Sequence, residues 1–325
     1  MSPHEIAEVF GISDQDAAVR MQKLAAAGFV KAEAHAGQTF WRATPLPPGA
    51  FPLEVVKISH VPPESRVEST ADLTPLVTAA IQGLYTQVAD QPAKGYHFPL
   101  GMQALLHCGY PEDQLRKLPV TATESFAGVG NPHLAKAIRP GNTVLDVGSG
   151  SGTDVLFSTL LVGDSGKVYG LDMTPAMIAK ARRNIAAMGA KNAEIVEGNA
   201  TKIPLPSATV DAVTSNGVLN LVPDKAAAFA EIARVLKPGG RLQLADIVVQ
   251  SDVAATCGIN PQLWADCIGG ASVEKDYLAF IEEAGFKDVK IVNRLDFWAK
   301  SASDYTRKIT KTFGAETIVI SAVKP

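Results

Sequence analysis

The strongest constraint on the fold is a glycine-rich stretch in the middle of the chain, NTVLDVGSGSGTDVLFSTLLVG, at residues 142–163. Residues 143–147 form a short apolar run typical of a buried strand, and an apolar helix is predicted directly after the glycines. Glycines at a strand-to-helix turn let the backbone approach a ligand closely, because they carry no side chain. The stretch therefore predicts an α/β domain with a ligand at the end of this strand.

An aspartate beside the glycines indicates which ligand is bound. Asp146 lies just before Gly148, where a carboxylate would repel the pyrophosphate of a dinucleotide. It can instead accept a hydrogen bond from the ammonium group of S-adenosylmethionine, which carries no phosphate. Asp172 ends the next predicted strand, 26 residues later, where a carboxylate can bind ribose hydroxyls. Asn199 ends the following strand and can meet the adenine edge.

These spacings predict S-adenosylmethionine as the cofactor, and no metal site is predicted. The residues expected to form the cofactor site are Asp146, Gly148, Ser149, Gly150, Gly152, Asp172, Met173, Asn199, Ala200 and Ser215. The alternative is a degenerate α/β domain whose glycines only make a tight turn. The agreement of two acids, the glycines and the order of elements favours the cofactor site.

Strands and helices alternate after the glycine loop, which predicts a mostly parallel, doubly wound sheet. A helix is expected at about 175–188, and a Pro-Gly-Gly turn at 238–240 is expected to separate a helix from the fifth strand. Ligands of such sheets bind beyond the carboxyl ends of the strands. The cofactor and its reaction partner are therefore expected to share one edge of the sheet.

The first 45 residues are expected to form a separate winged-helix-like domain. Two capped helices are predicted up to Ala27, followed by strands at 29–34 and 39–43 around a short turn. Residues 1–43 carry four basic and five acidic side chains, a balance that does not favour DNA binding. Dimerisation or closure of a lid is the preferred interpretation for this domain.

Composition limits the environment and the partners of the chain. A net charge of -3 does not favour general binding to nucleic acid or to an anionic membrane. Three cysteines without a CxxC pair are typical of a reduced compartment. We see no signal peptide and no apolar run long enough to cross a bilayer. A cytoplasmic protein is expected, with a proline-rich linker and helical lid at 46–120 and the cofactor-binding domain at 121–325.

From the glycine loop to the VLKPGG turn, the order of motifs resembles the class I S-adenosylmethionine-dependent methyltransferases. The resemblance implies a Rossmann-like sheet of seven strands, mostly parallel, whose last pair is antiparallel. All six histidines precede the glycine loop. This does not favour the winged-helix O-methyltransferases, which carry a histidine base late in the core. A soft acceptor such as a thiolate, a selenolate or trivalent arsenic needs no such base.

Four further segments narrow the resemblance. WADCIGGA at 264–271, SNGVLNLVPDK at 215–225, ESFAGVGNP at 124–132 and GYHF at 95–98 resemble the arsenite methyltransferase family. The resemblance implies a small-molecule methyl acceptor, trivalent arsenic, held by cysteine thiolates near the cofactor sulfonium.

By position, the resemblance makes Cys267 an arsenic-binding thiolate. Cys257 and Cys108 are candidates for a second thiol, and burial as a small apolar side chain is the alternative for each. One position departs from the family, because a motif that often reads Ser-Asn-Cys ends here in Gly217. The acceptor therefore stays open between arsenic and a thiol, a selenium compound or another metabolite. A cofactor-sensing winged-helix regulator and a non-catalytic dimer partner are the alternatives to an enzyme.

Overall fold

The computed structural model describes residues 30–35, 38–43, 74–250 and 269–325. The chain divides into two compact units, Met1–Glu68 and Ser69–Pro325. In the first unit, β1 (Val30–His35) and β2 (Gln38–Ala43) form an antiparallel hairpin, which confirms the two predicted strands. The two helices predicted before them lie outside the described residues.

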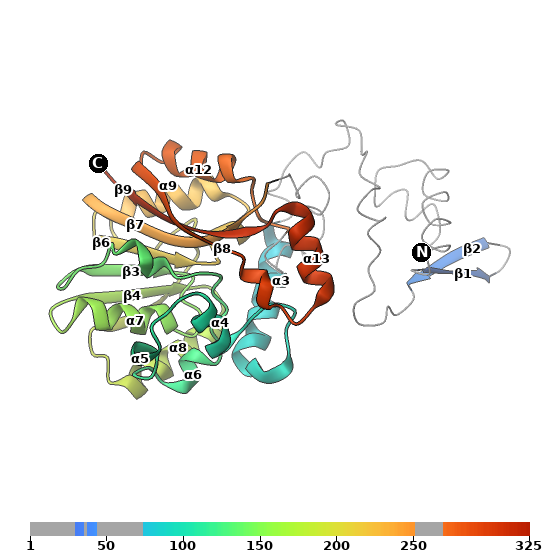
Figure 1. Ribbon diagram of the computed structural model, residues 1–325, viewed down its shortest axis with the longest axis horizontal. Helices are drawn as coiled ribbons and strands as arrows, with labels where there is room; N and C mark the ends of the chain where they lie inside the picture. The colour runs from blue at the N-terminus through green and yellow to red at the C-terminus, as the bar shows by residue number, and fades with distance from the viewer. Residues whose placement is uncertain (1–29, 36–37, 44–73, 251–268) are drawn as a thin grey trace. The chain divides into compact units, whose positions relative to one another are not determined.

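The second unit contains a sheet of seven strands (Figure 1). The strands are β3 (Thr143–Val147), β4 (Lys167–Asp172), β5 (Ala193–Glu197), β6 (Val210–Asn216), β7 (Leu236–Val248), β8 (Lys287–Leu295) and β9 (Glu316–Val323). Their order across the sheet is β5-β4-β3-β6-β7-β9-β8. The first five run parallel. The last pair, β8 and β9, is antiparallel, as predicted, and β9 is also antiparallel to β7. The order reverses between β3 and β6, the position at which sheets of this kind open a ligand crevice.

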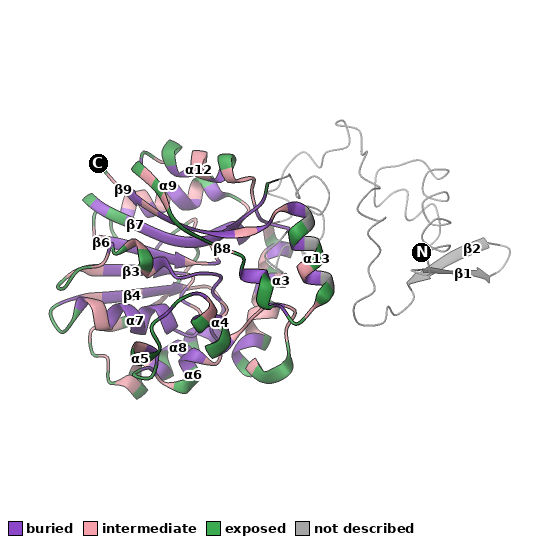
Figure 2. Cartoon of the chain, in the orientation of Figure 1, coloured by how far each residue is buried: buried purple, intermediate pink, exposed green. Residues whose placement is uncertain are grey.

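Helices cover both faces of the sheet. Alternate residues of β3 point to opposite sides, and the apolar residues on each side pack against helices. Val144 packs with residues of α7 (Thr153–Val162) and α8 (Pro175–Met188), whereas Leu145 packs with residues of α9 (Lys225–Val235) and α12 (Glu274–Glu283). Figure 2 shows the buried strands between these two helical layers. The glycine loop is therefore built on a strand that is buried on both faces.

The remaining elements of this unit pack around the sheet. They are α3 (Thr74–Asp90), η4 (Pro92–Lys94), α4 (Gly101–His107), α5 (Glu112–Leu115), α6 (Val120–Thr123), η5 (Pro132–Ala135), η6 (Leu219–Leu221), η7 (Phe297–Lys300) and α13 (Asp304–Phe313). The helices expected to form a lid contact α8 through the buried Lys180, whose Nζ donates to Ala89 O at 2.9 Å and Glu124 Oε1 at 2.8 Å. None of the helices within the described ranges is long and apolar enough to cross a membrane.

One sequence prediction differs in detail from the structure. The Pro-Gly-Gly turn lies inside the bounds of β7, which begins at Leu236 directly after α9. The pairing of β7 with β6 jumps from Leu236 to Arg241, so the residues between them bulge out of the ladder. Gly239 makes this possible with a φ of 76°. The predicted turn is therefore a bulge at the start of the fifth parallel strand.

Candidate functional site

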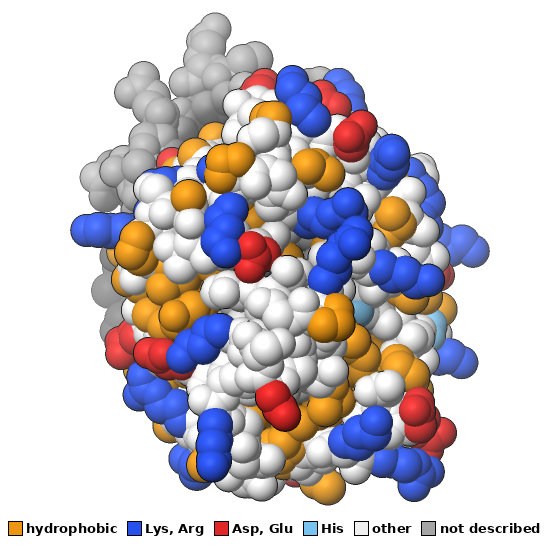
Figure 3. Space-filling model, turned by 90° about the vertical axis from the view of Figure 1, so that its left-hand side faces the viewer, with side chains coloured by type: hydrophobic (Ala, Val, Ile, Leu, Met, Phe, Trp, Pro, Cys, Tyr) orange, Lys and Arg blue, Asp and Glu red, His pale blue; other side chains and the backbone are white. Residues whose placement is uncertain are grey.

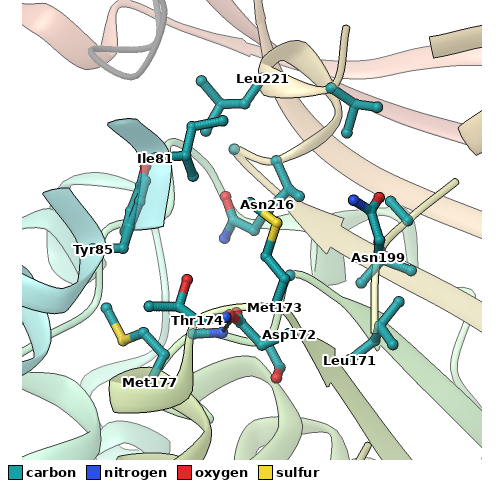
Figure 4. A pocket seen from close by; sticks show the side chains of 18 of the residues that line it. Ile81, Tyr85, Leu171, Asp172, Met173, Thr174, Met177, Asn199, Asn216 and Leu221 are labelled. Carbon is teal, nitrogen blue, oxygen red and sulfur yellow. Dashed lines mark hydrogen bonds between the residues drawn. The ribbon is translucent and has the colours of Figure 1, made fainter. Parts of the chain in front are cut away.

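A cavity of about 520 Å³ opens at the carboxyl ends of β3, β4, β5 and β6 (Figure 4). This volume suits a small-molecule ligand or cofactor. Eight of the ten residues predicted for the cofactor site line it: Asp146, Gly148, Ser149, Gly150, Asp172, Met173, Asn199 and Ala200. The predicted residues at the ends of β3, β4 and β5 thus line one cavity.

The glycine loop is held in place by β4. The N–H groups of Gly148 and Ser149 both donate to Leu171 O at 2.8 Å. Gly148 has a φ of 74°, and a Cβ added there would lie 2.2 Å from Val218 Cγ2. Only glycine fits this position without a shift of the chain, because both the backbone angle and the space exclude a side chain.

Two of the predicted residues, Gly152 and Ser215, do not line the cavity. Gly152 caps the start of α7 with a φ of 89°, and a Cβ there would lie 3.2 Å from the Cβ of Ala181. Ser215 is buried in β6 and donates from Oγ to Val147 O at 3.0 Å. Gly152 therefore allows close packing of α7 on α8, and Ser215 ties β6 to β3.

Asp172 joins the glycine loop to the start of α8. Its carboxylate accepts hydrogen bonds from the N–H of Gly150 at 2.8 Å and of Thr174 at 2.8 Å. Burial raises the pKa of Asp172 above its ordinary value, and these hydrogen bonds oppose that shift. On the neighbouring strand, the Oδ1 of Asn199 accepts from Thr201 N, which leaves the side-chain amide NH₂ as a donor toward a ligand.

Asp146 is only 2% exposed, and its carboxylate has no hydrogen-bond partner among the described residues. Burial, followed by the nearby charges of Asp154 and Asp172, raises its pKa well above the ordinary value. A buried carboxyl group that lines a cavity without a partner is completed by a cationic ligand. This supports a fit between the cavity and the ammonium group of S-adenosylmethionine.

Sequence reasoning missed the other walls of the cavity. Ile81 and Tyr85 of α3 face it from one side, and Leu221 of η6 lies beside Ile81 (Figure 4). Asp154 and Asn216 also line it. Asp154, in the first turn of α7, directly follows the glycine motif, so the sequence could have revealed it. Nothing in the local sequence predicts that α3 lies against the cavity.

Of the three cysteines predicted to bind the acceptor, the structure describes one. Cys257 and Cys267 lie outside the described residues. Cys108 follows α4, is 3% exposed and does not line the cavity. Burial, with a smaller contribution from Asp154, raises the pKa of this thiol above its ordinary value. Gly217, where the family motif often has cysteine, does line the cavity.

No histidine side chain lines the cavity among the described residues. His133 comes nearest in its contacts, because its Nε2 lies 3.0 Å from the cavity residue Asp154. The described part of the chain therefore presents no histidine base to a bound acceptor.

The two edges of the sheet differ in charge. Asp146, Asp154 and Asp172 meet at the cavity edge, and the described residues contain no group of three side chains placed to hold a metal ion. Figure 3 shows the face at the other end of the parallel strands, where these strands begin. Lys and Arg side chains are more plentiful there than Asp and Glu side chains. The three carboxyl groups that line the cavity favour a cationic ligand.

Comparison with known proteins agrees with this geometry. A family model described as a methyltransferase domain matches residues 138–285. The chain is 39% identical over 183 residues to an arsenite methyltransferase of Halobacterium salinarum and 33% identical over 158 residues to that of Homo sapiens. These matches cover 56% and 46% of this chain but only 46% and 42% of the relatives. The chain thus spans a little under half the length of the curated relatives it matches.

Solved structures extend the comparison. A geranyl diphosphate C-methyltransferase from Streptomyces coelicolor, 17% identical with a TM-score of 0.53, covers 77% of this chain and 98% of its own and shows the fold alone. An arsenic(III) S-adenosylmethionine methyltransferase from Chlamydomonas reinhardtii is 30% identical with a TM-score of 0.57, covering 66% of this chain and 72% of its own. On the strength of this match, the chain belongs to the arsenite S-adenosylmethionine methyltransferase family.

Proposed function

We propose that this protein is an S-adenosylmethionine-dependent methyltransferase that acts on trivalent arsenic. One observation supports the proposal most strongly. A cavity at the β3–β6 switch point is lined by Asp146, Asp172 and the glycine loop, the groups predicted to bind the cofactor. The named arsenite methyltransferases among its relatives favour this enzyme over a cofactor-sensing regulator.

The residues of the cavity divide the binding of the cofactor between them. Asp172 would accept from the ribose hydroxyls, because its hydrogen bonds to Gly150 and Thr174 use only part of its acceptor capacity. Asn199 would donate to the adenine edge. Asp146 would accept from the ammonium group, which supplies the partner that its buried carboxyl group lacks.

The acceptor would be held by the thiolate of Cys267. Thiolates are soft ligands, and trivalent arsenic prefers them to oxygen. When bound, S-adenosylmethionine supplies a sulfonium methyl group, which a lone pair on trivalent arsenic can attack without a base. Cys257 stays a candidate second ligand, whereas Cys108 is not part of this proposal because it is buried and outside the cavity.

The N-terminal unit is proposed to serve dimerisation or closure rather than DNA binding. Its support is the charge of residues 1–43, which carry five acidic and four basic side chains. A cytoplasmic location is proposed from the reduced-cysteine pattern.

Methyl transfer from labelled S-adenosylmethionine tests the proposal across arsenite, selenite, small thiols and catechols. We expect arsenite to be methylated fastest, and we expect Cys267→Ser to lose this activity while keeping its fold and its cofactor affinity. Cys108→Ser is the matched control, and its activity should stay near that of the parent. Methylation of another acceptor, with none of arsenite, would overturn the arsenic proposal and keep the methyltransferase.

A further inference from the structure

A buried polar network lies beneath the cavity and is centred on Asp154. This aspartate stands in the first turn of α7 and is 5% exposed. Its partners come from four other parts of the chain: Tyr110, His133, Asn216 and, through the histidine, Gln243. None of these residues belongs to the predicted cofactor site, and segments so far apart in sequence meet only in the folded protein.

The hydrogen bonds fix the protonation of His133. Gln243 Oε1 accepts from Ala137 N at 3.0 Å, so the amide NH₂ of Gln243 must face the histidine. That NH₂ donates to His133 Nδ1 at 3.2 Å, and Nδ1 is therefore unprotonated. The proton of the neutral ring lies on Nε2, which donates to Asp154 Oδ1 at 3.0 Å.

Asp154 accepts from two further donors. Tyr110 OH donates to Oδ1 at 2.5 Å, and Asn216 Nδ2 donates to Oδ2 at 3.0 Å. Burial and the neighbouring carboxylate raise the pKa of Tyr110 well above its ordinary value, so this phenol keeps its proton and stays a donor. Three donors therefore fix the orientation of the Asp154 carboxylate.

The hydrogen-bond count leaves one acceptor position open. A carboxylate offers about four lone-pair positions, and the network fills two on Oδ1 and one on Oδ2. Asp154 also lines the cavity, so the open position on Oδ2 is available to a ligand there. A buried anion with an open acceptor position favours a cationic donor.

The position of Asp154 indicates which part of the cofactor it would meet. Asn199 follows β5 and Asp172 ends β4, whereas Asp154 bonds to Asn216 at the end of β6, on the far side of β3. A cofactor whose adenine and ribose lie over β5 and β4 would extend its amino-acid end toward β6. That end carries the ammonium group.

We propose that Asp154 is a second carboxylate that binds the amino-acid ammonium of the methyl donor, beside Asp146. Tyr110 and His133 are positioning residues whose hydrogen bonds hold Asp154 in place beside the cavity. The inference rests on the proposed function, because it requires that the cavity binds S-adenosylmethionine.

Calorimetry on the full-length protein with three ligands tests the role of Asp154. S-adenosylmethionine and S-adenosylhomocysteine carry the ammonium group, whereas methylthioadenosine lacks the amino-acid end. We expect Asp154→Asn to lower the affinity for S-adenosylmethionine and S-adenosylhomocysteine by about 10- to 100-fold. Its affinity for methylthioadenosine should fall by less than about twofold. Asp164→Asn, the same change at an exposed aspartate beyond the other end of α7, is the control and should bind all three like the parent.

Two His133 variants test the positioning role. His133→Gln keeps an N–H toward Asp154 and an acceptor toward Gln243, whereas His133→Phe keeps a ring but neither polar atom. We expect His133→Phe to weaken S-adenosylmethionine by about 3- to 10-fold without affecting methylthioadenosine, and His133→Gln to restore the affinity. Tyr110→Phe should behave like His133→Phe, and thermal melting will establish that each variant is folded.

Three results would overturn the inference. The first is a parent-like affinity of Asp154→Asn for S-adenosylmethionine. The second is an equal loss of affinity for methylthioadenosine and S-adenosylmethionine in this variant, which would mean a purely structural role. The third is equal affinity of His133→Phe and His133→Gln. Failure of the parent protein to bind any of the three ligands would instead count against the proposed function.

Discussion

The two sides of the cavity are built in different ways. On the cofactor side, Asp172 and the N–H groups of the glycine loop are tied to one another by hydrogen bonds of 2.8 Å. On the opposite side, Ile81 and Leu221 are apolar, are 7% and 4% exposed, and belong to elements far apart in the sequence. No cysteine lines either side among the described residues. Polar contacts thus fix the cofactor side, whereas packing shapes the apolar side.

This difference teaches which changes each side tolerates. A hydrogen-bonded loop with positive φ angles permits few substitutions, because each one removes a partner or strains the backbone. An apolar wall accepts substitutions of similar volume at a cost below about 1.5 kcal/mol, so its shape can vary among relatives. The apolar side should therefore tolerate more substitutions than the cofactor side.

The largest effect is expected at the contact between the two sides. Gly148→Ala places a Cβ 2.2 Å from Val218 Cγ2 at a φ of 74°. We expect a loss of about 2–5 kcal/mol in the free energy of unfolding, from backbone strain and overpacking together. Gly150→Ala is the control, because its φ is 53° and no atom lies within 4 Å of the added Cβ. Denaturant unfolding that ranks Gly150→Ala as the more damaging would contradict this account.

The free energy of unfolding should depend on pH through Asp246, which supports the apolar side of the cavity. Asp246 lies near the end of β7 and accepts from Asn220 N at 2.9 Å and Tyr277 OH at 2.7 Å. The hydrogen bond from Asn220 holds η6 and its Leu221 in place. Burial raises the pKa of Asp246 from 3.8 to about 6. The folded state therefore keeps a proton that the unfolded state has lost, and this stabilisation is present below pH about 4 and disappears as the pH rises through about 6.

The pKa difference of Asp246 corresponds to about 3 kcal/mol between these pH limits. Asp246→Asn should lack this component, so the parent should lose stability relative to the variant as the pH rises from about 4 to about 7. Urea unfolding at several pH values measures the difference. Asp276→Asn, at an exposed position of α12, should follow the parent at every pH. Parallel curves for the parent and Asp246→Asn would exclude this role of Asp246.

On the cofactor side, Asp172→Ala should weaken S-adenosylmethionine binding by about 1–3 kcal/mol, or about 5- to 150-fold. The carboxylate is expected to bind the ribose, and its loss also frees the N–H groups of Gly150 and Thr174. Calorimetry measures the change, with Asp164→Ala as the exposed control. An unchanged affinity in Asp172→Ala would remove Asp172 from the cofactor site.

The smallest stability effect is expected at Gly217, which lines the cavity at the position where the family motif often has cysteine. Gly217 has a φ of 71°, and a Cβ there would lie 3.1 Å from Val129 Cγ1. Gly217→Cys and Gly217→Ser should each lose about 1–2 kcal/mol of stability, because both need a left-handed backbone. Only the cysteine adds a thiolate, and it should lower the KM for arsenite by about 10-fold or more through a second ligand. Equal KM values for the two variants would show that position 217 does not meet the acceptor.

The sequence by itself determined the sheet and most of the cofactor side. The acid, the glycines and Asp172 can be recognised without coordinates, because the turn needs positive φ angles and the ligand needs carboxylates at strand ends. The antiparallel last pair of strands, which the family resemblance implied, is confirmed. Gly152 and Ser215 were assigned to the cavity because they belong to the same motifs, and their local spacing did not reveal that one serves helix packing and the other ties two strands together.

Only the tertiary structure decided which distant residues complete the cavity. Tyr110 and His133 meet Asp154 across 44 and 21 residues of chain, and Ile81 reaches the site because α3 packs on α8. Cys108 was a candidate ligand in the sequence, yet packing buries its thiol away from the cavity and raises its pKa. Local patterns encode strands, turns and caps, whereas the partners of a buried side chain depend on how the elements pack together.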